Sequence, residues 1–135
     1  MQKKQPVLIK PEEGKRLTGA LGGYGRRMLN HTHSNKLCMG ILYVDPGKSP
    51  HRWHSHEERD SNEGFVVTYP EGFEEAYFIV QGKGVLQWRE NGELREKRVE
   101  TGDVIHFPPD VYEHQLLNDQ ETPMTVVYAT APPVV

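Results

Sequence analysis

The sequence has one cysteine, no long apolar run and no excess of positive charge. The single cysteine, Cys38, cannot form a disulfide within the chain. No stretch approaches the roughly 20 apolar residues of a membrane span, and the start, MQKKQPVLIK, has too short an apolar run for a secretory signal. Because 16 Lys and Arg are outnumbered by 19 Asp and Glu, the net charge of −3 provides no general attraction for phosphate backbones. We therefore expect a cytoplasmic protein that binds neither nucleic acid nor membranes.

Apolar residues at helical spacing are also scarce, and alternating patterns take their place. Turn signals, among them many of the 13 glycines and 10 prolines, divide the chain into short pieces. The strongest hairpin signal is Asn91-Gly92. The strands expected from this pattern cover residues 36–44, 74–80, 85–90, 93–99, 103–107, 114–117 and 124–129. So many short antiparallel strands predict one all-β domain, a barrel or a jelly roll.

Histidine is abundant: the chain has seven, and three of them lie between positions 51 and 56. If the segment PHRWHSHE (50–57) is extended, its side chains alternate between two faces. One face then carries Arg52, His54 and His56, and the other carries His51, Trp53 and Ser55. Two imidazoles about 7 Å apart on one strand face can converge on one metal ion. The alternative is a pair of solvated or hydrogen-bonded histidines.

A second His-x-His pair, His31 and His33, provides an internal comparison. It lies in the polar stretch NHTHSN, with no converging carboxylate nearby in the sequence. We expect no metal at this pair.

The residues around His54 and His56 distinguish that pair from the other. Asp45-Pro46-Gly47 precedes it, and Glu75 follows it, with Gly82 further along the segment EAYFIVQGKG. This order resembles the first motif of the cupin superfamily.

The second cupin motif also has a counterpart, which runs from Gly102-Asp103 through Pro108 to His114 and Asn118. The resemblance covers about residues 37–130. It implies a small double-stranded β-helix, or jelly-roll barrel, in which three histidines and one glutamate hold a divalent metal. Carried over residue by residue, the ligands would be His54, His56, Glu75 and His114.

The spacing departs from the family pattern at three places, one of which is an additional residue before His114, after Pro108-Pro109-Asp110. Between Gly47 and His54 there is one residue more than the family usually has, which a β-bulge could absorb. Residues 57–74 separate His56 from Glu75, where the family has only a few residues. We expect this insertion to form a loop at the barrel mouth, where loops carry specificity.

The predicted strands and the cupin resemblance divide the chain into a barrel and an N-terminal segment. The barrel spans residues 36–130, and residues 1–35 are expected to wrap either the barrel or a partner subunit. Because single-domain cupins commonly pair their barrels, the resemblance also implies a homodimer.

The alternation of side chains along the strand that begins at residue 74 is consistent with Glu75 as a ligand. The predicted inward face of its strand carries Glu75, Tyr77 and Ile79. An apolar interior accepts a carboxylate at low cost only if a cation neutralises it. The alternatives are that Glu75 is an exposed acid at a strand end or that Glu74 points inward. The spacing to Gly82 favours Glu75.

Three further residues are candidates for catalysis. Tyr77 could donate a proton or a hydrogen bond, or it could simply pack. His106 is a general acid or base near neutral pH if it faces inward, and a surface residue if it faces outward. Arg52 could hold an anionic substrate group. We expect Trp53 and His51 to pack beneath the N-terminal segment or a second subunit.

The implied ligand set suits Fe(II), Mn(II), Ni(II), Co(II) or Zn(II) and does not decide among them. In octahedral geometry it leaves two adjacent positions for substrate oxygens. The favoured hypothesis is therefore an enzyme that isomerises, cyclises, cleaves by lyase chemistry or dioxygenates a small oxygen-rich or aromatic molecule. The alternative is a non-catalytic cupin that binds or senses a small molecule.

Overall fold

The protein is almost entirely β-structure in the part of the chain that the computed structural model describes. That part comprises residues 2–17, 23–51, 53–56, 58–60 and 66–134. A short 3₁₀ helix, η1, spans Pro11–Glu13, and none of the described residues form a helix long and apolar enough to cross a membrane. The strands are β1 (Lys15–Leu17), β2 (Gly23–Leu29), β3 (Cys38–Val44), β4 (Glu58–Asp60), β5 (Val66–Thr68), β6 (Glu74–Gln81), β7 (Lys83–Glu90), β8 (Glu93–Glu100), β9 (Val104–Phe107), β10 (His114–Leu117) and β11 (Met124–Ala131).

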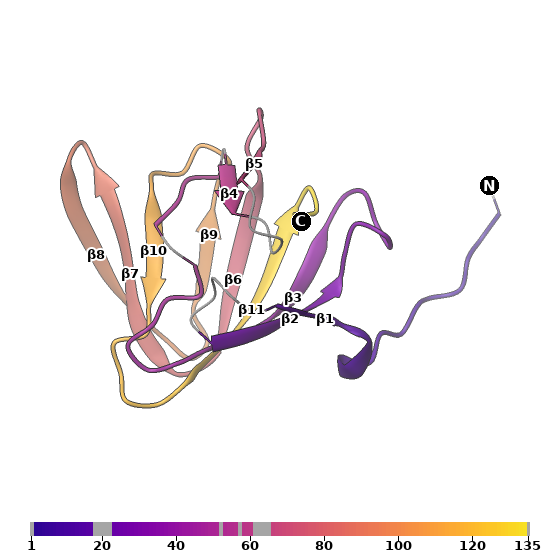
Figure 1. Ribbon diagram of the computed structural model, residues 1–135, viewed down its shortest axis with the longest axis horizontal. Helices are drawn as coiled ribbons and strands as arrows, with labels where there is room; N and C mark the ends of the chain where they lie inside the picture. Colours follow the sequence, from indigo (N-terminus) through magenta and orange to yellow (C-terminus); the bar gives the residue numbers. More distant parts are fainter. Residues whose placement is uncertain (1, 18–22, 52, 57, 61–65, 135) are drawn as a thin grey trace.

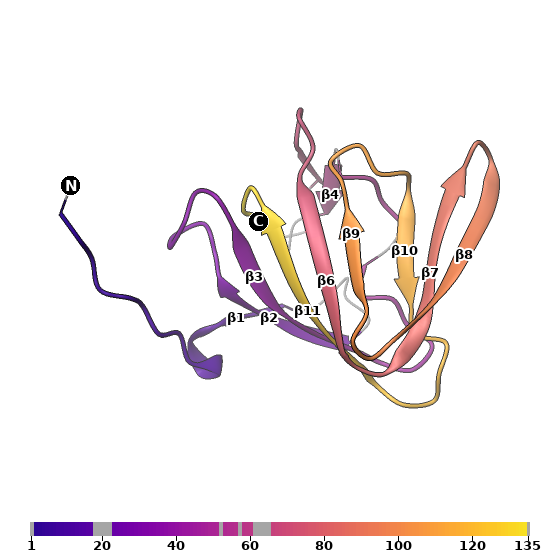
Figure 2. The ribbon, with the colours of Figure 1, turned by 180° about the vertical axis from the view of Figure 1, so that it is seen from behind.

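The strands form two main antiparallel sheets and a small hairpin. The larger sheet has the order β1-β2-β3-β11-β6-β9, the smaller has the order β10-β7-β8, and β4 pairs with β5. In Figures 1 and 2 the smaller sheet lies on one side of β6 and β9, and β11, β3 and β2 curve away on the other. The prediction of an all-β jelly roll is confirmed.

The core follows the alternation read from the sequence. In β6, Glu75, Tyr77 and Ile79 are buried, and the residues between them are more exposed. In the neighbouring strand β11, Val126 and Tyr128 are buried in the same way. Because successive side chains of a strand point to opposite faces, one face of each strand supplies the core. The predicted inward face of β6 is thus confirmed.

All seven strands expected from the sequence are present, as β3 and β6 to β11. The turn between β7 and β8 shows why Asn91-Gly92 is a strong signal. Asn91 has a φ of 51° and Gly92 a φ of 80°, so both central residues adopt the left-handed conformation that a tight hairpin turn of this kind requires.

The N-terminal segment contributes strands to the larger sheet. β1 pairs with β2, and β2 pairs with β3, so the sheet begins before residue 36. Leu17 is buried, and the buried Arg27 donates a hydrogen bond from Nε to the hydroxyl oxygen of Tyr128 (3.2 Å). Figure 1 shows the chain before η1 extending away from the sheets. The 57–74 insertion contains the β4–β5 hairpin.

Candidate metal centre

The four side chains singled out by the cupin motifs lie close together, and two of them, Glu75 and His114, come from strands of different sheets. The ring centroid of His114 is 4.7 Å from that of His54 and 4.9 Å from that of His56. His56 Nε2 is 3.6 Å from the Oε1 atom of Glu75. All but His54 are buried, and His54 is partly buried. The structure therefore brings the expected ligands to one place.

Backbone pairing positions these side chains. His54 and His114 form an isolated antiparallel bridge, which adds the His54 backbone to the free edge of β10. Glu75 is the second residue of β6, where strand alternation turns it into the core. The centre thus lies where the edge of the smaller sheet faces β6 of the larger one.

Hydrogen bonds fix the imidazole tautomers. The Nδ1 atoms of His56 and His114 lie 2.8 Å from the carbonyl oxygens of Phe73 and Tyr112, respectively. Because a carbonyl can only accept, each Nδ1 carries the proton and each Nε2 keeps its lone pair, the form that binds metals. Among the described residues, the buried Nε2 of His114 has no hydrogen-bond partner.

Aromatic rings hold two of the imidazoles in place. The His56 ring stacks on Phe73 at a centroid distance of 4.0 Å, and the His114 ring stacks on Phe107 at 4.4 Å. Burial in this surrounding lowers the pKa of His114 below its ordinary value. The imidazole is therefore neutral at neutral pH, as a metal ligand must be.

The donor atoms are spaced for a metal ion. Those of His54, His56 and Glu75 lie within 4.8 Å of one another, and so do those of His51, His54 and His114. Two donors bound to one ion at about 2.0–2.2 Å are at most about 4.4 Å apart, so small side-chain movements suffice. The charge of the buried Glu75 also favours a cation here. The residues fit a divalent metal.

His51 lies on the same side as the expected ligands, contrary to the parity prediction. Its ring centroid is 4.2 Å from that of His54 and 5.8 Å from that of His114. The prediction was wrong because residues 51 and 53 lie in bends and not in an extended strand. Alternation therefore does not apply to this segment, and sequence reasoning missed His51 as a member of the site.

The family assignment rests on the sequence beyond β5. Residues 69–130, which include Glu75 and His114, match the family model described as the cupin domain. These residues are therefore identified as a cupin domain. The match begins after His54 and His56, so the first two proposed ligands of this cupin lie outside it. No curated protein sequence matches the chain.

Several solved structures share the cupin fold with this chain. A sugar phosphate isomerase of the cupin superfamily from Silicibacter pomeroyi is 19% identical, with 93% of this chain and 75% of that chain covered and a TM-score of 0.68. The polyketide cyclase RemF from Streptomyces resistomycificus is 14% identical, with coverages of 94% and 80% and a TM-score of 0.67. A protein described as a predicted oxalate decarboxylase from Thermotoga maritima is 19% identical, with coverages of 93% and 99% and a TM-score of 0.64. At these identities the likeness shows the fold alone.

The other catalytic candidates of this cupin have different surroundings. Tyr77 is buried, and its ring centroid lies 6.3 Å from that of His51, so it lines the centre. His106 is exposed on the outer face of β9, and its Nε2 forms a hydrogen bond with Glu74 Oε1 (2.6 Å). Of the two orientations left open, the structure gives the outward one, which removes His106 from the site. Arg52 lies outside the described residues.

The remaining histidines and Trp53 are not part of the centre. Trp53 lies against Arg89 of β7, whose guanidinium is 4.6 Å from the ring centroid. His31 and His33 are exposed in the turn after β2, where the backbone N–H of Asn30 donates to His33 Nδ1 (3.1 Å).

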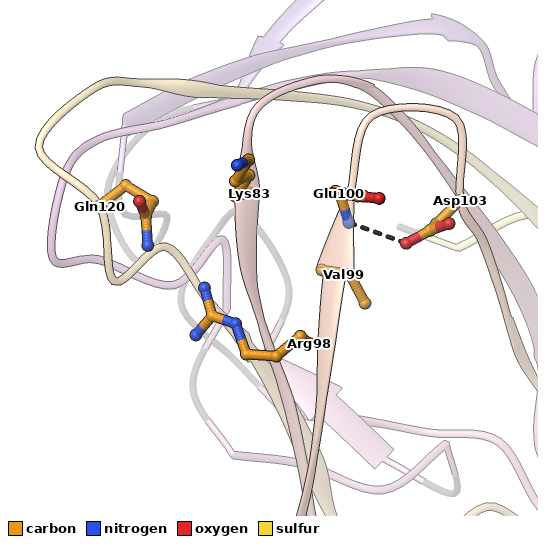
Figure 3. Close-up of a pocket in the computed structure, with 6 residues that line it drawn as sticks. All are labelled: Lys83, Arg98, Val99, Glu100, Asp103 and Gln120. Atoms are coloured by element: carbon orange, nitrogen blue, oxygen red, sulfur yellow. Dashed lines mark hydrogen bonds between the residues drawn. The ribbon is translucent and has the colours of Figure 1, made fainter.

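A separate pocket of about 480 Å³ lies where the β6–β7 and β8–β9 turns meet the loop after β10 (Figure 3). Its lining mixes both signs of charge, and Arg98 forms an ion pair with Asp119 beside it. The lining residues are Lys83, Arg98, Val99, Glu100, Asp103 and Gln120. None of the proposed ligands belongs to this pocket.

Proposed function

We propose that this cupin is an enzyme that binds one divalent transition metal and acts on a small oxygen-rich or aromatic organic molecule. The observation that carries the proposal is the convergence of donors from both sheets, with the Nε2 atoms of His56 and His114 left as lone-pair donors. The proposed ligands are His54, His56, Glu75 and His114. The metal is one of Fe, Mn, Ni, Co and Zn, all of which accept this ligand set.

When bound, such an ion supplies a Lewis acid that stabilises negative charge developing on a substrate oxygen, or a place where dioxygen and substrate meet. The similar structures include an isomerase, a cyclase and a protein described as a predicted decarboxylase, which supports the first of these roles. We therefore favour isomerisation, cyclisation or lyase chemistry over dioxygenation.

The surrounding residues have their own roles in this proposal. Phe73 and Phe107 are buried beside the imidazoles, orient them and exclude water. Exclusion of water strengthens electrostatic interactions at the centre. The Tyr77 hydroxyl is the proposed donor of a hydrogen bond or a proton to the substrate.

The site assignment is tested by the metal content of protein purified without chelator. We expect about one divalent ion per chain in the wild type and almost none in the His54→Ala/His56→Ala variant. The matched control is His31→Ala/His33→Ala, which removes the exposed pair and should retain the metal. Absence of metal from the wild type, or equal content in all three proteins, would overturn the assignment.

Measurement of substrate turnover distinguishes an enzyme from a protein that only binds a small molecule. The metal-loaded protein is incubated with sugar phosphates, uronates, catechols and β-diketones, and product formation and oxygen uptake are followed. We expect turnover of one class without oxygen uptake, and its loss in the His54→Ala/His56→Ala variant. Tight binding of one compound with no turnover of any would instead support the non-catalytic alternative.

A further inference from the structure

The chain segment that carries His51 is attached to β10 at both of its ends. At one end, the backbone N–H of Gly47 donates to Asn118 O (2.7 Å), and the N–H of Asn118 donates to Lys48 O (2.9 Å). At the other end, His54 and His114 exchange backbone hydrogen bonds of 3.2 and 3.0 Å. These two attachments fix the distance that the intervening segment must span.

The segment has more residues than its partner strand over that span. Five residues, 49–53, lie between Lys48 and His54, whereas three, 115–117, lie between His114 and Asn118. The two additional residues have no counterparts in β10, so the segment must depart from regular pairing, as at a β-bulge. The additional residue between Gly47 and His54, noted in the sequence, contributes to this excess.

This departure turns His51 toward the centre. The Ser49 hydroxyl donates a hydrogen bond to the carbonyl oxygen of His51 (2.6 Å), within the irregular segment. The His51 ring then lies edge-on to the His54 ring, at a centroid distance of 4.2 Å. Its donor atom lies within 4.8 Å of those of His54 and His114, the same limit that holds for His54, His56 and Glu75.

We propose that His51 is a fifth protein ligand of the metal centre. The inference rests on the proposed function, because it needs the metal held by the other four residues. In an octahedral complex, His51 would hold one of the two positions that those four ligands leave open. A single position would then remain for a substrate oxygen, such as that of a carbonyl or a carboxylate, which would exclude a chelate.

The number of metal-bound imidazoles tests the proposal directly in the wild-type protein. Zn(II) is added to protein labelled with ¹⁵N in the histidine rings, and ¹H–¹⁵N correlation NMR counts the ring nitrogens shifted by metal. We expect four bound imidazoles, and three in the His51→Gln variant. Three in the wild type would overturn the role of His51 and leave the proposed function intact. A wild type that binds no Zn(II) or other divalent metal would overturn both.

Water and probe binding provide an independent measurement. In Mn(II)-loaded protein, proton relaxivity should indicate one metal-bound water in the wild type and two in His51→Gln, with His106→Gln as the matched control. Metal affinity should fall at least about tenfold in His51→Gln. A loss of about tenfold is the smallest that is typical when a residue hydrogen-bonded to a metal ligand is replaced, and loss of a ligand itself should cost at least as much. Acetohydroxamate, which chelates, should bind more tightly to His51→Gln than to the wild type, whereas azide should bind both alike. Equal relaxivity and affinity in both proteins would contradict the proposal.

Discussion

His54 and His114 are hydrogen-bonded to each other through their backbones in both directions, and their rings lie 4.7 Å apart. Because these bonds involve no side chain, they place two of the proposed ligands without help from a metal ion. The buried stacks on Phe73 and Phe107 orient the rings of His56 and His114 in the same way. A site held by backbone pairing and packing is preorganised, so metal binding does not have to order it.

Metal removal should therefore lower stability without unfolding the protein. A ligand that binds only the native state stabilises it by about 2.7 kcal/mol when its free concentration is 100 times its Kd. For a chain of 135 residues this corresponds to a rise in Tm of several degrees. Thermal unfolding followed by circular dichroism, with and without EDTA, measures the shift. The His54→Ala/His56→Ala variant should melt at the same temperature in both conditions, and loss of the β-spectrum in EDTA would contradict the expectation.

Replacement of Phe73 by Leu should weaken metal binding more than it weakens the fold. Leucine fills most of the buried volume, so we expect a loss of about 1–2 kcal/mol in the free energy of unfolding. The His56 ring, however, loses the planar surface on which it stacks. A chelator competition should show reduced metal affinity for Phe73→Leu and unchanged affinity for Phe78→Leu, which alters an exposed phenylalanine of β6. Equal affinities in the two variants would show that the stack does not position His56.

The ion pair beside the pocket should make stability depend on pH in the acid range. Hydrogen bonding to Arg98 lowers the pKa of Asp119 from 3.8 to about 2. Because the folded-state pKa is the lower one, this stabilisation is complete above the unfolded pKa of 3.8 and is lost as the pH falls through about 2. Unfolding measured between pH 7 and 2 should show a smaller decrease for Asp119→Asn than for the wild type. Added salt should reduce the difference, since the pair is partly exposed.

The homodimer stays a prediction, and we expect its interface to lie on the outer face of β6 and β9. Phe78 and Val104 are directly paired across these strands and are 45% and 66% exposed. A second copy would remove both side chains from water. Light scattering should give a dimer mass for the wild type and a monomer mass for Phe78→Glu. The control Leu94→Glu, on exposed β8, should stay dimeric, and a monomeric wild type would contradict the prediction.

The parts of the fold that the sequence predicted are those in which local pattern decides. Alternation found β6 and its inward face, and turn chemistry found the hairpin at Asn91-Gly92. β2 was not predicted, because its sequence GYGRRML has no clear alternation. Its place depends on distant partners: Arg27 bonds to Tyr128, and a Cβ at Gly25 would lie 2.8 Å from the carbonyl oxygen of Ile41.

The sequence predicted those residues of the site that belong to the two cupin motifs. His54, His56, Glu75 and His114 were chosen by resemblance, and the structure places them together. His51 was missed because its direction depends on the count of residues between two attachments to β10. That count becomes meaningful only when the partner strand is known, and β10 lies about 60 residues further along the chain.

The adjacent acids Glu74 and Glu75 each face a histidine, but on opposite sides of the sheet. Glu74 forms its hydrogen bond with His106 on the outer face, whereas Glu75 lies 3.6 Å from His56 Nε2 in the interior. Because successive side chains of a strand point to opposite faces, a slip of β6 by one residue would exchange the two acids. The register of β6 therefore decides which of two identical side chains enters the interior and which stays at the surface.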